Sequence, residues 1–288
     1  VVALVSGGGS ALLPSPPPGM TLADEIAVNE ALLASGAPIS AMNTVRKHLS
    51  TVKGGRLALA AHPAKVVSLI VSDIPGDNPA FVASGPTVAD AAGRDEALAI
   101  VEAYRLDLPE AAMRHLRSEA ADAPRPGDPR LAANEVRIVA SAALSLEAAA
   151  REARRHGLEA VILSDSIEGE ARDVAGVHAA IAREIALRGR PFARPALLLS
   201  GGETTVTVRG KGGKGGRNGE FLLAFALGIE GCAGIHGFAA DTDGIDGSGD
   251  NAGAFADTTS AGRMRAAWSA SADEVQFRDG VHGMLVWS

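Results

Sequence analysis

Three carboxylates share one short loop in the last fifth of the chain. Asp241, Asp243 and Asp246 stand in the run Asp-Thr-Asp-Gly-Ile-Asp-Gly, directly after the apolar segment 235–240. Like charges at this spacing repel one another unless a cation or hydrogen-bond donors balance them. Hard cations such as Mg²⁺ take carboxylate oxygens and retain several waters. We therefore interpret the loop as a magnesium site, with a plain turn as the alternative.

A fourth candidate metal ligand, Asp73, follows the apolar run 66–71. A carboxylate at the end of a buried strand could hold Mg²⁺ through water or orient a hydroxyl group. The alternative is an Asx turn, in which the side chain binds neighbouring backbone N–H groups. The small polar loop that contains Ser84 and Gly85 leaves the same two interpretations open.

Two Ser-Gly-Gly runs each follow an apolar segment that predicts a strand. The carboxyl end of a parallel strand is the usual place for a ligand in an open α/β sheet. Glycines let successive N–H groups turn toward an anion and let it approach the backbone, although a tight turn is the alternative. The expected contacts are Gly7, Gly8, Gly9 and Ser10 in the first run, and Ser200, Gly201, Gly202, Glu203 and Thr204 in the second.

Basic residues gather between positions 46 and 56. Arg46, Lys47 and Lys53 belong to this group, and at helical spacing Arg46 and Lys53 lie about two turns apart on one face. Such a cluster suits recognition of a carboxylate or a phosphate. The alternative is a solvated helix face, which is the commoner fate of a run of charges.

Arg217 and Asn218 follow a second glycine-rich run. Residues 210–215 formally match G-x-G-x-x-G, but the two lysines inside the run favour a flap over polyphosphate more than a dinucleotide fingerprint. The sequence contains no G-x-x-x-x-G-K-[ST] motif, which excludes a P-loop kinase. Arg217 could neutralise charge on a transferring phosphoryl group, and a surface ion pair with Glu220 is the alternative.

Strand and helix signals alternate along the chain, and these elements must position the candidate residues. Alternation of this kind predicts parallel sheets covered by helices. Strands are expected at 1–5, 66–71, 136–140, 160–163, 196–199 and 235–240, and helices near 22–35, 40–49, 57–61, 142–156 and 170–187.

The first long helix begins with a capping signal. Thr21 is the expected N-cap, with Asp24 three residues later, and Leu22, Ile26 and Leu33 form an apolar face. Further along, the run 121–132 is rich in proline and polar residues. It is the best candidate for a linker between domains.

Composition excludes several classes of protein. The 288 residues are 47% hydrophobic and 21% charged, which predicts a sizeable core and argues against disorder. The formal net charge of −7 argues against a non-specific nucleic-acid binder. No apolar run approaches the roughly 18 residues of a membrane span. The single cysteine, Cys232, excludes an internal disulfide and suits a reducing cytoplasm.

The order of these motifs resembles that of the glycerate 2-kinase family with a C-terminal MOFRL domain. Some members of this family bear the older name hydroxypyruvate reductase. The resemblance extends from about residue 1 to about residue 255. It is carried by the runs at 6–13, 43–50 with 53–56, 84–87, 200–205, 215–218 and 241–247.

This resemblance implies two α/β domains, Rossmann-like or flavodoxin-like, with the active site in the cleft between them. We expect the first domain at 1–125 and the second at 130–288, with the MOFRL part at about 194–288. The implied activity is ATP- and Mg²⁺-dependent phosphorylation of D-glycerate to 2-phosphoglycerate in the cytoplasm by a protein that could form a homodimer. The expected catalytic residues are Arg46, Lys53 and Arg217.

The chain departs from the family pattern at both ends. Members carry an upstream Gly-Lys-Ala segment and a downstream Thr-Gly-Pro-Thr-Gly-Thr-Asn-like motif, and neither is present here. We therefore expect a chain truncated at both ends. Two other functions stay open, namely an NAD(P)H-dependent hydroxypyruvate reductase that uses the run 210–215, and an inactive fragment that binds nucleotide.

Overall fold

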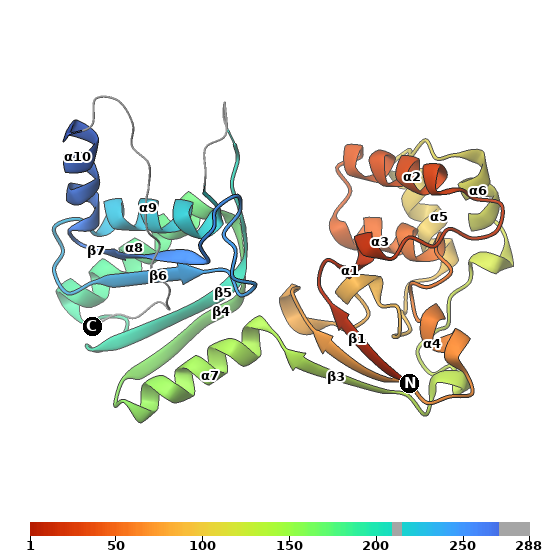
Figure 1. The fold of residues 1–288 in the computed structure, drawn as a ribbon, viewed down its shortest axis with the longest axis horizontal. Coiled ribbons are helices and arrows are strands. Elements are labelled where there is room, and N and C mark those ends of the chain that lie inside the picture. Colours follow the sequence, from red (N-terminus) through yellow and green to blue (C-terminus); the bar gives the residue numbers. More distant parts are fainter. Residues whose placement is uncertain (209–214, 271–288) are drawn as a thin grey trace. The chain divides into compact units, whose positions relative to one another are not determined.

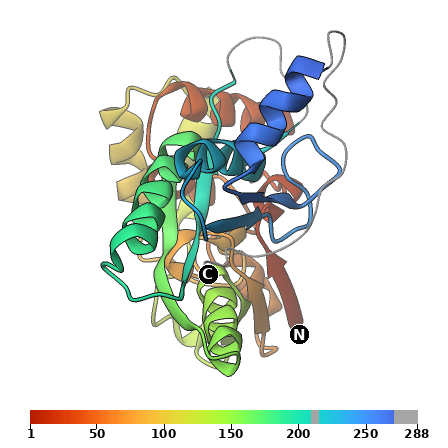
Figure 2. The ribbon, with the colours of Figure 1, turned by 90° about the vertical axis from the view of Figure 1, so that its left-hand side faces the viewer.

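The computed structural model describes residues 1–208 and 215–270. The chain divides into two units, Val1–Ser141 and Ala142–Ser288, and both combine helices with strands (Figure 1 and Figure 2). Two of the three sheets that the described residues form are parallel, so the mixed α/β class with mainly parallel sheets is confirmed. No helix of the described part of the chain is long and apolar enough to cross a membrane.

The first unit is built on a three-stranded parallel sheet. Its order is β1 (Val2–Ser6), β2 (Val67–Val71) and β3 (Glu135–Ala140), which matches the strands expected from the apolar runs. Because β3 pairs with β2, the chain divides after β3, and the proline-rich run 121–132 lies inside the first unit. The carboxyl ends of these strands lie at one edge of the sheet, where Gly7 and Asp73 follow β1 and β2.

Helices of the first unit form a separate apolar cluster. Its buried residues include Val28, Leu32, Val45, Val101 and Leu116. The helices are α1 (Gly9–Leu12), α2 (Leu22–Ala34), α3 (Ile39–His48), α4 (Arg56–Ala61), α5 (Arg94–Ala103) and α6 (Glu110–Leu116), with 3₁₀ turns at Pro75–Asp77, Val82–Ser84, Glu119–Ala121 and Pro129–Leu131.

Helix α2 begins where we expected, but it buries a different face from the one we expected. Thr21 and Asp24 form the capping box, with the Asp24 N–H donating to the Thr21 hydroxyl over 3.2 Å. The expected apolar face is exposed, however, since Leu22, Ile26 and Leu33 are 53%, 50% and 67% accessible. The buried stripe is instead Glu25, Val28 and Leu32, so a carboxylate enters the interior of the unit.

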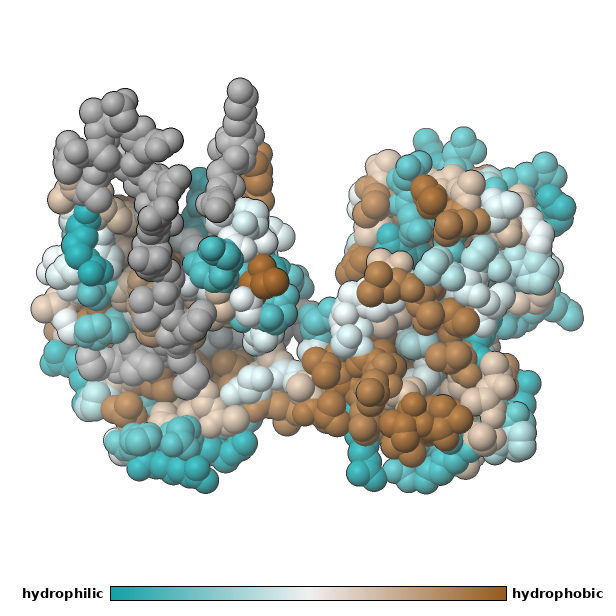
Figure 3. Space-filling view, in the orientation of Figure 1, coloured by the Kyte–Doolittle hydropathy of each residue, from teal (hydrophilic) through white to brown (hydrophobic). Residues whose placement is uncertain are grey.

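One face of the β1–β3 sheet is apolar and accessible. Hydrophobic residues gather over these strands in Figure 3. Val2 and Leu4 on the edge strand β1 are 66% and 80% exposed, and Val71 and Val139 on its neighbours are 44% and 51% exposed. Parallel sheets are normally covered on both faces, so the described residues leave this face without its usual cover.

Among its described residues, the second unit contains two small sheets and four helices. Strands β4 (Glu159–Glu170) and β5 (Ala196–Thr205) are parallel, and β6 (His236–Ala240) and β7 (Gly253–Asp257) are antiparallel. Its core is centred on Phe225 and Ile229, which are fully buried. The helices are α7 (Ala142–Arg155), α8 (Ala171–Arg188), α9 (Arg217–Ile229) and α10 (Ser260–Ala270).

The second Ser-Gly-Gly run is part of a strand, whereas we expected it to follow the strand as a ligand-binding run. Strand β5 continues through Ser200–Glu203 to Thr205 and pairs with β4 over its whole length. A β-carbon at Gly202 would overlap the backbone of Ile167, and Gly202 has φ 147°. Glycine is therefore required by the close contact between two irregular strands, which explains this run without a ligand.

Candidate functional site

The first glycine run forms a turn that touches Asp73. Gly7 follows β1 and Asp73 follows β2, and a β-carbon at Gly7 would overlap the Asp73 carboxyl group. The Asp73 side chain is exposed at the edge of the sheet. The structure thus brings together two predicted site segments that are more than sixty residues apart in the sequence.

Hydrogen bonds join this turn to the loop at 84–85. The hydroxyls of Ser10 and Ser84 are 2.8 Å apart, and Ser84 is buried. Ala83 and Ser84 adopt positive φ angles of 49° and 62°, which cost of order 1 kcal/mol or more each. The next contact leads to the basic segment, because the N–H of Gly54 donates to the Ser84 carbonyl over 3.0 Å.

Lys47 lies in the interior of the first unit, which corrects its expected role in binding. Its side chain is 1% exposed and its ammonium group lies 2.5 Å from Asp90 Oδ2. The same group sits 4.5 Å from the centre of the Phe81 ring. Burial lowers the pKa of Lys47, and the hydrogen bond that Lys47 donates to Asp90 opposes that shift. Lys47 therefore holds α3 in place and offers no exposed donor to a ligand.

Lys53 is also almost fully buried. Its ammonium group lies 3.5 Å from Glu25 Oε1, and the second oxygen, Oε2, is buried without a hydrogen-bond partner. Burial lowers the pKa of Lys53, the charge of Glu25 opposes this shift, and Arg46 adds to it. Lys53 and Arg46 therefore feel each other's charge, although not through the helical spacing we expected, because α3 ends at His48 and Lys53 lies in the turn before α4.

Arg46 is the more accessible cation of the predicted cluster. Its Nε donates to Asn29 Oδ1 over 2.7 Å, and one terminal nitrogen donates to Asn43 Oδ1 over 3.5 Å. Both partners are neutral amides, and the ion pairs found among the described residues do not include Arg46. Burial lowers the pKa of Arg46, because the surroundings stabilise its positive charge less well than water does.

Arg217 connects three elements of the second unit. It is the first residue of α9, and its guanidinium pairs with Glu203 on β5 and donates to Asp241 Oδ2 over 3.0 Å. The expected alternative, a pair with Glu220, is not formed, because Glu220 binds Arg172 at 2.7 Å. Two predicted site residues, Glu203 and Asp241, therefore meet around a third, Arg217, at the start of α9.

Asp246 caps helix α9. It is 2% exposed, and its carboxylate accepts from the N–H groups of Asn218 and Gly219 over 3.0 and 2.8 Å. The Asn218 side-chain amide adds a third hydrogen bond of 3.2 Å. Donors thus balance this charge, and the repulsion argument that predicted a cation is satisfied by the helix N-terminus instead.

The acidic loop does not fit a resident magnesium ion. Asp246 is occupied by α9, Asp241 pairs with Arg217, and Asp243 accepts from the Ile245 N–H over 2.9 Å in an Asx turn. Within residues 1–208 and 215–270, no three His, Cys, Asp or Glu side chains are grouped closely enough to hold a metal. The three carboxylates of this loop are therefore not assigned as ligands of a magnesium ion.

Ser200 has a structural partner that the sequence did not suggest. Buried His178 on α8 lies with Nε2 2.9 Å from the Ser200 hydroxyl, and its Nδ1 lies 2.9 Å from the Val174 carbonyl oxygen. Its ring packs edge-on against Phe221 at 5.3 Å. Burial lowers the pKa of His178. These contacts tie β5 to α8 and α9, next to the residues that hold Arg217.

Sequence reasoning missed Glu25, Asn29 and Asp90, which partner the predicted cations. Glu25 and Asn29 are four residues apart on α2, so they share one face of that helix. The capping box fixed where α2 begins but not which face it buries. The run 210–215, which the reductase interpretation uses, lies outside the described residues except for Gly215.

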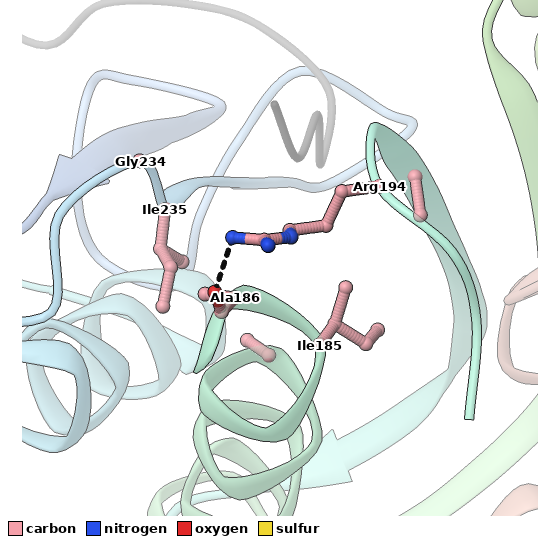
Figure 4. A pocket seen from close by; sticks show the side chains of 7 residues that line it. Ile185, Ala186, Arg194, Gly234 and Ile235 are labelled. Carbon is pink, nitrogen blue, oxygen red and sulfur yellow. Dashed lines mark hydrogen bonds between the residues drawn. The ribbon is translucent and has the colours of Figure 1, made fainter. Parts of the chain in front are cut away.

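The hollows found in the described residues lie away from these groups. A cavity of about 10 Å³ in the second unit is closed by Arg194, which donates to the Ala186 carbonyl over 2.6 Å beside Ile185 and Ile235 (Figure 4). That volume admits about one water. An open hollow of about 560 Å³ in the first unit is lined by residues of α5 and α6, such as Leu98 and Met113. Neither contains a predicted site residue.

Two family models match the chain. The domain of unknown function DUF4147 matches residues 1–117, and the MOFRL family matches residues 196–284. A protein of Agrobacterium vitis named putative hydroxypyruvate reductase is 53% identical over 92% of this chain and 68% of its own length. A glycerate 2-kinase of Pyrococcus horikoshii is 44% identical over 92% of this chain and 60% of its own length.

A solved structure has the same fold. The crystal structure of a glycerate kinase from Thermotoga maritima aligns with a TM-score of 0.84 and 38% identity, over 93% of this chain and 63% of that chain. The chain thus spans between 60% and 68% of the length of these relatives.

Proposed function

Since this chain belongs to the glycerate 2-kinase family that carries a MOFRL domain, we propose that it takes part in the phosphorylation of D-glycerate by ATP. The observation that carries the proposal is the likeness to a relative named glycerate 2-kinase across more than nine tenths of the chain. In the reaction, the 2-hydroxyl oxygen of glycerate bonds to the γ-phosphorus of ATP. The bond to the bridging oxygen breaks, ADP leaves with that electron pair, and the hydroxyl proton is released.

In the second unit we assign the transferring phosphoryl group to Arg217. Phosphoryl transfer needs mainly positioning and charge stabilisation, which a fixed guanidinium supplies. Glu203 on β5 and Asp241, directly after β6, hold the Arg217 side chain, and Asp246 fixes the first turn of α9 from which it projects. The side chain is 34% exposed, so part of it is free to meet a ligand.

In the first unit we assign ligand binding to the turn after β1. Ser10 presents a hydroxyl that buried Ser84 holds by a hydrogen bond, and Gly7 brings the backbone against Asp73. Asp73 would orient the hydroxyl that attacks, because its exposed carboxylate is an acceptor at the sheet edge. Magnesium enters this proposal as part of the substrate, ATP in its magnesium complex, since Mg²⁺ commonly stays on the phosphates.

A coupled assay that consumes 2-phosphoglycerate tests the proposal. The full chain should form this product only with ATP, Mg²⁺ and D-glycerate together. Arg217→Ala should reduce kcat by about two orders of magnitude or more. Arg172→Ala is the matched control, because Arg172 also forms an exposed ion pair in the second unit, and it should keep kcat. ATP binding without turnover would identify the chain as a nucleotide-binding fragment.

A reductase remains the second candidate, because the Agrobacterium vitis relative bears the name putative hydroxypyruvate reductase. It predicts NADH or NADPH oxidation by hydroxypyruvate in the absence of ATP. Measuring both reactions on one preparation separates the two functions.

A homodimer and a cytoplasmic location complete the proposal. The accessible apolar face around Val2 and Leu4 supports self-association, because such a face is costly to leave in water. The free, buried Cys232 is compatible with a reducing compartment. Sedimentation velocity over a range of protein concentrations tests the dimer.

A further inference from the structure

The first unit contains a partly buried positive charge that no described side chain neutralises. Arg46 on α3 is held by the amide oxygens of Asn29 and Asn43, and its neighbour Lys53 is paired with Glu25. Arg46 and Lys53 therefore have one carboxylate partner between them, and the group carries an excess of one positive charge. Arginine in such a place is usually paired, because removing a charge from water is costly unless an opposite charge repays it.

The helix end does not supply the missing negative charge. Arg46 lies in the last turn of α3, where the macrodipole offers roughly half of a negative charge. Lys47 and His48 occupy the same turn and share that field. Lys47 has its own carboxylate in Asp90, whereas Arg46 has none within ion-pair distance among the described residues.

Asn29 is oriented so that it stays an acceptor toward Arg46. Its Nδ2 donates to the Glu25 carbonyl one helical turn earlier, over 3.0 Å. That bond leaves Oδ1 to receive the Arg46 Nε, over 2.7 Å. The amide therefore fixes the guanidinium at Nε and does not cancel its charge, so the terminal nitrogens keep donors for a planar, bidentate partner.

We propose that Arg46 binds the carboxylate of a small hydroxy acid, and that Asn29 is a positioning residue whose neutrality keeps this site open. The excess of one positive charge matches a monoanion, whereas a nucleotide triphosphate would demand several cations. The identification of that acid as the glycerate substrate rests on the proposed kinase function. The anion site itself rests on the contacts of Arg46 alone.

Isosteric charge changes test the site. Asn29→Asp and Asn43→Asp each place a carboxylate beside Arg46 without changing side-chain size. Calorimetric titration of the full chain with D-glycerate should show binding that either variant weakens roughly tenfold or more, the effect of losing a charge-assisted contact. Arg46→Gln should abolish binding, and Arg46→Lys should retain part of it.

The control is the same substitution at Asn134, directly before strand β3. Asn134 precedes β3, where its Oδ1 accepts from the Val66 N–H over 2.8 Å, and Asn134→Asp can keep this bond while adding the same charge. Its affinity for D-glycerate should equal that of the wild type. All variants should keep their midpoints of thermal unfolding within a few degrees of the wild type. If Asn29 had a purely structural role, Asn29→Asp would instead lose stability together with glycerate binding.

The outcomes separate the site from the kinase proposal. Glycerate binding that Asn29→Asp weakens, without turnover, upholds the anion site while the kinase proposal fails. Turnover with an unchanged KM for glycerate in Asn29→Asp overturns the site while the kinase proposal stands. Inorganic phosphate binding more tightly than D-glycerate and glycolate at Arg46 overturns the carboxylate class. The absence of any glycerate binding overturns the inference as a whole.

Discussion

The buried pair of Lys47 and Asp90 allows a sharp test of what this lysine does. Replacing Lys47 by Met keeps most of the side-chain volume but leaves Asp90 as an uncompensated charge in a region where Lys47 is 1% exposed. Removing one partner of a buried pair costs about 3–5 kcal/mol. The contact of the ammonium group with the Phe81 ring adds about 1–2 kcal/mol where water is excluded.

A loss of this size is large for a unit of this length. About 4 kcal/mol corresponds to a decrease of roughly 10–15 °C in the midpoint of thermal unfolding. Circular dichroism on heating measures it, and the double variant Lys47→Met with Asp90→Leu should recover much of the loss because no charge is left unpaired. A midpoint within about 2 °C of the wild type for Lys47→Met, together with weaker ligand binding, would refute the structural role.

Three further changes test other parts of the structure. His178 is buried with a lowered pKa, so the unfolded chain takes up a proton at this residue before the folded chain does, and stability should fall as the pH drops below about 6.5. Urea denaturation at pH 7.5 and 5.5 should show a smaller loss of stability for His178→Gln than for the wild type. Asp246→Ala removes the cap of α9 and leaves its N–H groups unpaired, which should cost about 1–2 kcal/mol by chemical denaturation, and an unchanged midpoint would contradict the cap. Leu4→Lys places a charge on the exposed edge strand and should reduce concentration-dependent self-association in sedimentation experiments, which a loss of folding would not mimic if circular dichroism stays unchanged.

Local signals in the sequence predicted where the elements lie more reliably than which faces they bury. Period and apolar runs placed β1, β2 and β3, and the capping box placed the start of α2. The face of α2 was wrong, because its leucines and isoleucine form one plausible stripe and the buried stripe runs through a glutamate. A hydrophobicity pattern cannot predict a buried carboxylate that is stabilised by an ion pair with a lysine more than twenty residues away.

The candidate site divides in the same way. Glycine runs and a strand-end aspartate predicted that Gly7 and Asp73 follow strands of a parallel sheet. The sequence did not predict that these two residues touch, or that Ser84 joins the turn through Ser10. The second Ser-Gly-Gly run has the same composition but lies within β5, where close contact with β4 requires glycine. The Ser-Gly-Gly segment itself is common to both runs, and the pairing of the backbone distinguishes a turn from a bulged strand.

Charge runs show most clearly why function needs the fold. Arg46 and Lys47 are adjacent in the sequence, but successive helical residues point about 100° apart, so one meets amides and the other meets a carboxylate. The difference between a structural cation and a binding cation therefore lies in the partner and not in the residue. A cation that is already paired with a carboxylate contributes to stability, whereas a cation held by neutral oxygens can still attract an anionic ligand. By that criterion Arg46 is the candidate for anion recognition among the cations at 46–53, whereas Lys47 and Lys53 are already paired with Asp90 and Glu25.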